Sequence, residues 1–189
     1  MELLEFLQRM PKVEIHCHLF GTVRLDTLLA LGEKYQVPMS REELAGFYVR
    51  GEKPKGVLHL LRALDQHFIK DTDDLYRLTY EYLQDAQAHG VRYSEFFWNP
   101  TGTVDISGIS YAEAQDAIIR AVHSAETDFG ILGRLVPAID REASPTQAVD
   151  PRVRSSPGAT ACRATACRRS AVRLTALRRC WGRGRTPQA

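Results

Sequence analysis

Three short stretches with strand-like composition, separated by helical segments, constrain the fold of this chain more than any other feature. They cover residues 13–19, 91–98 and 132–139. Residues 91–98, VRYSEFFW, have the density of β-branched and aromatic side chains that is typical of a strand. Strands that are separated by helices usually pair in parallel through right-handed crossovers. The sequence therefore predicts an α/β fold around a parallel sheet.

Helices between these strands are predicted from apolar residues that recur three and four positions apart. One helix is expected to begin at Asp26, whose carboxylate would act as the N-cap. Two more are expected over residues 55–68 and 70–90. A fourth follows Ser110, which forms a capping-box pattern with Glu113. Each pair of consecutive strands is thus joined by at least one helix, as parallel pairing requires.

The chain changes character near residue 150. Residues 1–150 hold all 23 acidic residues and 15 of the 25 basic ones, whereas residues 151–189 hold ten Arg, no Lys and no acid. The tail is rich in Arg, Ala, Gly and Pro, whose codons are GC-rich, and it lacks a sustained apolar period. A GC-rich gene read out of frame yields such a composition. We expect one folded domain over 1–150 and an irregular basic tail over 151–189, either disordered or a frameshift product.

The overall composition narrows the class of protein. The chain is 44% hydrophobic and 25% charged, as ordinary globular proteins are. No apolar run approaches the roughly 20 residues of a membrane helix, and the start MELLEFLQRM lacks the features of a secretory signal. We therefore expect a cytoplasmic protein without a membrane partner. Four cysteines in such a chain do not suggest disulfides, and the three in the tail lack a fourth zinc ligand.

His16 and His18 are the strongest candidates for a functional site. Alternate residues of a strand project to the same face, so Glu14, His16 and His18 are expected on one face and Cys17 on the other. In a parallel βα barrel, active sites form at the carboxyl ends of the strands. A catalytic zinc ion takes tetrahedral nitrogen and oxygen ligands, so two imidazoles supply half of such a site. Two hydrogen-bonded structural histidines would give the same pattern.

The segment that contains these histidines resembles the signature of a known family. Residues 11–21, PKVEIHCHLFG, are similar to the pattern P-K-x-E-L-H-x-H-L-x-G of the adenosine deaminase family. Residues 90–102 and 133–145 are similar to the second and third barrel strands of that family, so the resemblance covers about residues 8–150. It implies the N-terminal portion of a TIM (β/α)8 barrel, with about three of eight strands and helical insertions.

The resemblance also implies a zinc-dependent hydrolytic deaminase of an adenosine- or adenine-type purine, with His16 and His18 as two ligands of one Zn²⁺. Zinc in such enzymes lowers the pKa of a water molecule, and acidic and basic side chains move protons to and from the purine and the water. The apolar stretch around Leu61 is similar to the lid over the purine, although plain core leucines would look the same. Phe20 occupies the substrate-binding position where adenosine-specific members have an acid. The expected substrate is therefore a free base, a modified nucleoside or another aminopurine.

The motifs that carry the remaining chemistry of the family do not occur in the sequence. The third zinc-binding His, the catalytic Glu of an H-A-G-E motif, the water-directing His and its paired Asp all follow the third strand in the family. The remaining histidines are expected on helix surfaces: His59, His67, His89 and His123. We expect no catalytic residue in this chain and an incomplete zinc site, so that the chain by itself is an inactive, truncated enzyme.

Two other functions remain open at this point. The first is a nucleic-acid-binding protein that acts through the arginines of the tail. Trp181 is the one aromatic residue of the tail available for base stacking, which argues against nucleic acid as a partner. The second is a half-barrel module that docks with a separately made C-terminal half, because three parallel strands leave edges and an apolar face uncovered.

Overall fold

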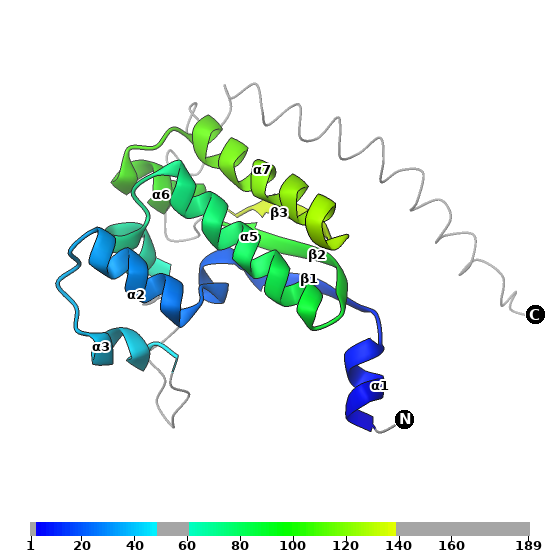
Figure 1. Ribbon diagram of the computed structural model, residues 1–189. Helices are drawn as coiled ribbons and strands as arrows, with labels where there is room; N and C mark the ends of the chain where they lie inside the picture. The colour runs from blue at the N-terminus through cyan, green and yellow to red at the C-terminus, as the bar shows by residue number, and fades with distance from the viewer. Residues whose placement is uncertain (1–2, 49–60, 139–189) are drawn as a thin grey trace, which may run out of the picture. The chain divides into compact units, whose positions relative to one another are not determined.

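The sheet is parallel and three-stranded, as predicted (Figure 1). The computed structural model describes residues 3–48 and 61–138. The strands are β1 (Lys12–His18), β2 (Val91–Trp98) and β3 (Leu132–Pro137), in the order β1-β2-β3. The α/β class and the positions of all three strands are thereby confirmed. The predicted tail and residue 139 of the third predicted strand lie outside the described residues.

Helices of very different length connect and flank the strands. They are α1 (Leu3–Arg9), the 3₁₀ turn η1 (Leu19–Thr22), α2 (Leu25–Lys34), α3 (Arg41–Gly46), the π-helical segment η2 (Leu64–Phe68), α5 (Thr72–Ala88), α6 (Pro100–Ser107) and α7 (Tyr111–Phe129). The sequence predicts α5 and α7 correctly but not α1, α3 and α6, which are too short to show a clear apolar period. Within the part of the chain that the structure describes, none of the helices combines the length and the hydrophobicity that crossing a bilayer demands.

The two long helices begin with reciprocal capping contacts. At the start of α5, the Asp71 side chain accepts a 2.9 Å hydrogen bond from the backbone of Asp74, and Asp74 accepts one of 3.1 Å in return. Ser110 and Glu113 form the predicted capping box of α7. Gly130 ends α7 at a φ of 71°, a conformation that glycine adopts without a Cβ clash. Local sequence signals therefore fix the limits of both helices.

Helices α5 and α7 lie side by side over one face of the sheet and enclose the core with it (Figure 1). Gly133 on β3 permits the close approach, since a Cβ atom there would lie 3.2 Å from Val122 of α7 and 3.3 Å from Leu83 of α5. Fully buried side chains of this layer are Leu75, Leu83, Phe96, Ala114 and Ile118. The apolar side of each predicted helix is the side that faces the sheet.

The opposite face of the sheet is left largely open within the described part of the chain. On β1, the side chains of Val13 and Ile15 are 64% and 65% exposed. Strands β1 and β3 are the outer strands, and one edge of each pairs with no other described strand. This is the uncovered apolar face expected of three parallel strands that do not close into a barrel.

The start of α2 differs from the prediction. Its N-cap is Arg24, which has extended backbone and makes no side-chain capping bond, so Asp26 lies within the first turn instead. The Arg24 guanidinium donates to both carboxylate oxygens of Asp85 on α5, at 2.9 and 2.6 Å. This long-range ion pair fixes where α2 begins, and the local sequence pattern does not predict the pair.

The helix predicted over residues 55–68 is only partly seen. Residues 55–60 lie outside the described residues, and residues 61–63 are α-helical. The helix then continues as the π-helical segment η2, which ends with a 3.0 Å hydrogen bond from the Ile69 amide to the Leu64 carbonyl. The wider turn brings an additional residue into each hydrogen-bonded ring, a change that apolar spacing does not predict.

Candidate metal centre at the end of strand β1

Strand β1 contains a bulge next to the two candidate ligands. Glu14 pairs with Ser94 of β2, and the next registered pair is Cys17 with Phe96. Between these two pairs, β1 therefore advances by three residues and β2 by two. Such an extra residue is a β-bulge, and it shifts the side chains that follow to the opposite face.

The bulge changes which side chains share a face. Glu14 and Cys17 both face the helix layer, where the Tyr82 hydroxyl donates a 2.8 Å hydrogen bond to Glu14. His16 and His18 lie on the open face with Phe97. The prediction that Glu14 shares a face with the two histidines is wrong, because strict alternation does not continue through a bulge.

The structure brings the two imidazoles together at the carboxyl end of β1. Their ring centroids lie 5.6 Å apart with an interplanar angle of 65°. The Phe97 ring of β2 lies beside both, at 4.9 Å from the His16 ring and 5.7 Å from the His18 ring. Both histidines are exposed, so their nitrogen atoms are accessible from the open face.

The donor set fits part of a zinc site. Imidazole nitrogen is a good zinc ligand, and the pair offers two such donors on one side of the strand. Residues 3–48 and 61–138 contain no group of three or more His, Cys, Asp or Glu side chains that could hold a metal ion. The Cys17 thiol faces away from the pair, and burial raises its pKa, although the Tyr82 hydrogen bond acts in the other direction. A neutral thiol on the wrong face does not complete the site.

The other predicted site residues lie near this strand end or on the helices. Phe20 is 6% exposed, within the turn η1 that directly follows β1. Leu61 is half-buried in the helical turn before η2. Their roles toward a substrate stay predictions. Of the remaining histidines, His89 and His123 are exposed as expected and His67 is half-buried, while His59 lies outside the described residues.

Tyr82 is a polar residue of this region that the sequence places only among the apolar residues of its helix. Its hydroxyl donates a 2.8 Å hydrogen bond to Glu14 and lies 2.6 Å from the Ser94 hydroxyl. Burial raises the pKa of this phenol, so it stays protonated and able to donate. In the sequence, the only sign of this contact is a tyrosine on the apolar side of a helix. That sign points to Glu14 only once the bulge in β1 is known.

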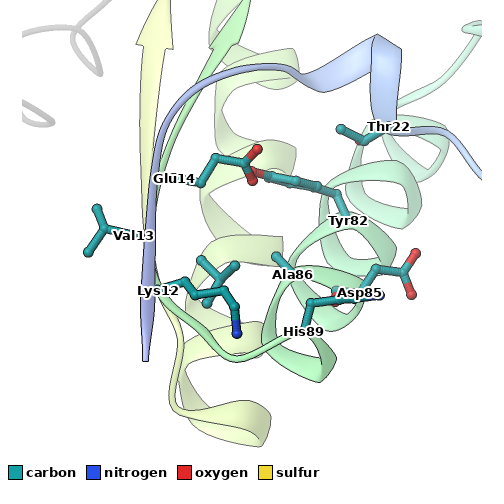
Figure 2. A pocket seen from close by; sticks show the side chains of 9 residues that line it. Lys12, Val13, Glu14, Thr22, Tyr82, Asp85, Ala86 and His89 are labelled. Atoms are coloured by element: carbon teal, nitrogen blue, oxygen red, sulfur yellow. The ribbon is translucent and has the colours of Figure 1, made fainter. Parts of the chain in front are cut away.

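A cavity of about 440 Å³ lies on the helix side of β1, between the strand and α5 (Figure 2). Charged side chains of both signs line it, among them Lys12, Glu14 and Asp85. Figure 2 shows the Glu14 carboxylate next to the hydroxyl end of Tyr82 within this space, and Val13 on the other side of the strand. The two imidazoles do not line the cavity, so it is separate from the candidate metal centre.

A match to a family model identifies the protein family of this chain. The family model described as adenosine deaminase matches residues 11–153, which include all three strands and the His16–His18 pair. The chain belongs to the adenosine deaminase family. The match confirms the resemblance expected from the sequence.

Solved structures of relatives agree with this family in fold. An amidohydrolase from Burkholderia ambifaria, solved with bound Zn, is 53% identical with a TM-score of 0.77, over 81% of this chain and 43% of its own. The N6-methyl-AMP deaminase of Arabidopsis thaliana is 26% identical with a TM-score of 0.64, over 80% and 46%. The deaminase-family chain thus has the fold of part of a TIM-barrel amidohydrolase, as predicted.

Curated members of the adenosine deaminase family are much longer than this chain. An adenine deaminase from Gibberella zeae is 31% identical over 72% of this chain and 40% of its own length. An adenosine deaminase from Clostridium botulinum is 26% identical over 68% and 40%. The chain therefore spans about 40% of the length of these relatives.

Proposed function

We propose that this deaminase-family chain supplies the first two metal ligands, His16 and His18, of a zinc-dependent hydrolytic deaminase. The observation that carries the proposal is the placement of the two imidazoles side by side on the open face at the carboxyl end of β1. In parallel βα barrels, catalytic groups gather at this end of the strands. The bound Zn of the 53% identical relative supports zinc as the metal.

The residues of this chain would hold and orient the metal. Zinc in such a site lowers the pKa of a water molecule toward neutrality and so supplies a nucleophile for hydrolysis. His16 and His18 would bind it through neutral imidazole nitrogens, and the Phe97 ring against both limits how far either can rotate. The groups that move protons to the purine and the water would come from outside the described residues.

The proposed substrate is a purine with an amino group at its six-membered ring. The relatives named above are an adenosine deaminase, an adenine deaminase and an N6-methyl-AMP deaminase. By resemblance, Phe20 stands where an acid binds the sugar hydroxyl in adenosine-specific members. A phenyl ring does not accept that hydrogen bond, which favours a free base or a modified nucleoside over adenosine.

We further propose that the chain does not deaminate by itself and that residues 151–189 take no part in the barrel. Two imidazoles leave a tetrahedral zinc site half-made. The length of the curated relatives and the end of the family match at residue 153 support this division. Activity would require the strands that the longer relatives possess.

A chimera tests the proposal directly. Residues 1–137 of this chain would be fused to the part of the Burkholderia ambifaria amidohydrolase that follows its third strand. We expect one zinc per chain and hydrolytic loss of the amine, as ammonia from adenine or adenosine or as methylamine from N6-methyl-AMP. His16→Ala should abolish both, whereas His89→Ala, an exposed histidine at the end of α5, should not. A chimera that keeps full zinc and turnover without His16 would refute the assignment.

A second candidate function is docking of this half-barrel with a separately made second half. The exposed Val13 and Ile15 and the unpaired edges of β1 and β3 favour it, since a parallel sheet is normally covered on both faces. Co-purification with the C-terminal part of the Burkholderia ambifaria relative measures it. Failure of the two parts to associate at micromolar concentration would count against docking.

A further inference from the structure

The helices over the sheet follow a regular arrangement. Helix α5 follows β1 along the chain and contacts β2, and α7 follows β2 and contacts β3 (Figure 1). Each helix therefore packs toward the strand that comes next, as right-handed crossovers require. No described strand pairs with the outer edge of β1, so the described part of the chain has no crossover helix on that side.

The cavity between β1 and α5 lies on the side of α5 that is away from α7, since its lining includes described residues of β1 and α5 but none of α7 (Figure 2). The lining residues of α5 are Tyr82, Asp85, Ala86 and His89. Their spacing of three and four residues places them in one stripe along the helix. Ala86 lies in the middle of the stripe, where a small side chain lets a second helix approach closely. The cavity of about 440 Å³ thus has the form of a groove for a helix.

The polar side chains that line the cavity already have hydrogen-bond partners within this chain. The pairs are Tyr82 with Glu14, Asp85 with Arg24, Lys12 with the Met10 carbonyl, His89 with the Asp85 carbonyl and Thr22 with the Leu19 carbonyl. A small polar ligand would have to displace these partners, whereas an apolar protein surface would leave them in place. The cavity therefore fits a packed protein element better than a polar ligand.

The surface next to the cavity is apolar. Lys12, which lines the cavity, also bonds to the end of α1 through the Leu7 carbonyl. No residue of α1 is buried within the described structure. The exposed large apolar side chains of this segment are Leu3, Leu4, Phe6, Leu7 and Met10. Exposed apolar patches of this kind mark contact sites for another protein element.

We infer that the cavity between β1 and α5 is the docking site for the last helix of the barrel, supplied by the separately made C-terminal half. In a closed barrel every strand is followed by a helix, and the last strand pairs with the first. A helix that follows the last strand and packs toward β1, as α5 packs toward β2, enters this cavity. The 53% identical Burkholderia ambifaria relative has more than half of its length outside the part that matches this chain, which leaves room for such a helix. The inference rests on the proposed docking of two half-barrels, for which it names the contact, and does not involve the metal.

The first measurement is calorimetric titration of the full 189-residue chain with the C-terminal part of that relative. Ala86→Trp places a large side chain in the cavity, and we expect it to weaken the association about 10-fold or more. Ala88→Trp is the matched control, because Ala88 is an exposed residue of α5 that does not line the cavity. It should bind as wild type does. Equal affinities of Ala86→Trp and wild type would overturn the inference and leave the docking of the two halves in place.

A second measurement decides the inference if wild type does not bind the C-terminal part, in which case the proposed docking of separate halves fails. A synthetic peptide with the sequence of the last barrel helix of the relative is titrated into the full ¹⁵N-labelled chain. We expect its NMR amide signals at Tyr82, Asp85, Ala86 and His89 to shift, and Ala86→Trp to reduce these shifts several-fold. Unshifted signals in wild type, or equal shifts in Ala86→Trp, would overturn the inference.

A second copy of this chain is the other possible occupant. In that case sedimentation of the chain alone would shift toward monomer in Ala86→Trp but not in Ala88→Trp, and the assignment to a helix of the second half would be overturned. Circular dichroism checks that the variants fold. If Ala86→Trp does not fold, Ala86→Leu takes its place with the same expected outcomes, since leucine also occupies the cavity with a smaller side chain.

Discussion

The Thr103 hydroxyl donates a 2.9 Å hydrogen bond to the Asp65 carboxylate and accepts one of 3.1 Å from the indole of Trp98. These three residues join η2 and α6 to the end of β2 at its carboxyl side. Leu61, the candidate lid residue, lies in the helical turn just before η2, which this contact holds against the sheet. Asp65 is therefore a link between the candidate lid and the sheet.

The stability of the chain should depend on pH through Asp65. Burial raises the pKa of Asp65 to about 7, although the Thr103 hydrogen bond acts in the other direction. The folded state then binds a proton that the unfolded state has lost, so stability is full below about pH 4 and declines as the pH rises to about 7. Asp65→Asn removes this loss and should be more stable than wild type at pH 8 by about 1–3 kcal/mol.

Urea unfolding of both proteins between pH 4 and pH 8 measures the difference, in which all other titrating groups cancel. Asparagine retains an oxygen that accepts the Thr103 bond, so packing changes little. A stability difference that is the same at every pH would show that Asp65 does not titrate in this range.

Gly102→Ala should disturb the same contact. A Cβ atom at Gly102 would overlap the Asp65 carboxylate, which would have to leave Thr103 to make room. We expect a loss of about 1–2 kcal/mol in the free energy of unfolding. Gly46→Ala is the matched control, since no described atom outside its own helix backbone and chain neighbours lies within 4 Å of the added Cβ, and it should change stability by less than about 0.5 kcal/mol.

A double variant identifies the cause of the Gly102 effect. In an Asp65→Ala background the carboxylate that the new Cβ would overlap is absent. Adding Gly102→Ala there should lower the free energy of unfolding only slightly. Substitutions that share a contact are non-additive, whereas independent ones add. An undiminished Gly102→Ala effect in that background would place its origin elsewhere.

Asp74 should be the most costly carboxylate to remove among those that join α2 to α5. It is 2% exposed and accepts hydrogen bonds from Lys34 at 2.8 Å, from Tyr35 at 2.6 Å and from two backbone amides. Asp74→Ala leaves these donors short of a partner, and we expect a loss of about 2–4 kcal/mol. The measurement is chemical unfolding at neutral pH.

Asp116→Ala provides the comparison for that prediction. Asp116 also pairs with a cation, Arg120, at 3.0 Å, but both side chains are exposed. Exposed pairs contribute little, so we expect a change below about 0.5 kcal/mol. Similar losses in the two variants would mean that burial does not govern the contribution of Asp74.

The regular elements could be predicted from the sequence because their causes are local. Residues 91–98 carry strand-forming side chains, and α5 and α7 have long apolar stripes with capping residues at their starts. The limits of α2 and the π-helical turn at η2 could not be predicted from the sequence, because each depends on contacts or hydrogen bonds that apolar spacing does not encode. Local patterns predict elements well and their junctions poorly.

The candidate site shows the same division. The pair His16 and His18 is recognisable from its spacing and from the surrounding signature residues. The face on which Glu14 lies is not recognisable from the sequence, because the hydroxyl that bonds to Glu14 belongs to Tyr82, 68 residues further along the chain. The sequence pattern of β1 is compatible with strict alternation, which the bulge between Glu14 and Cys17 interrupts in the structure.

The open face of the sheet should make the isolated chain associate with itself. Val13 and Ile15 are strongly exposed apolar side chains on the outer strand β1, and exposed apolar edges of this kind favour pairing with other chains. The double variant Val13→Lys, Ile15→Lys should shift the sedimentation profile toward monomer, because two charges at the edge oppose association. Its unfolding free energy should change by less than about 1 kcal/mol, since neither side chain is buried.

Ile106→Lys on α6 is the control, an exposed isoleucine away from β1 that should leave self-association as it is. If the double variant and the control sediment alike, association does not use this face, and docking of a second half-barrel there loses its support as well.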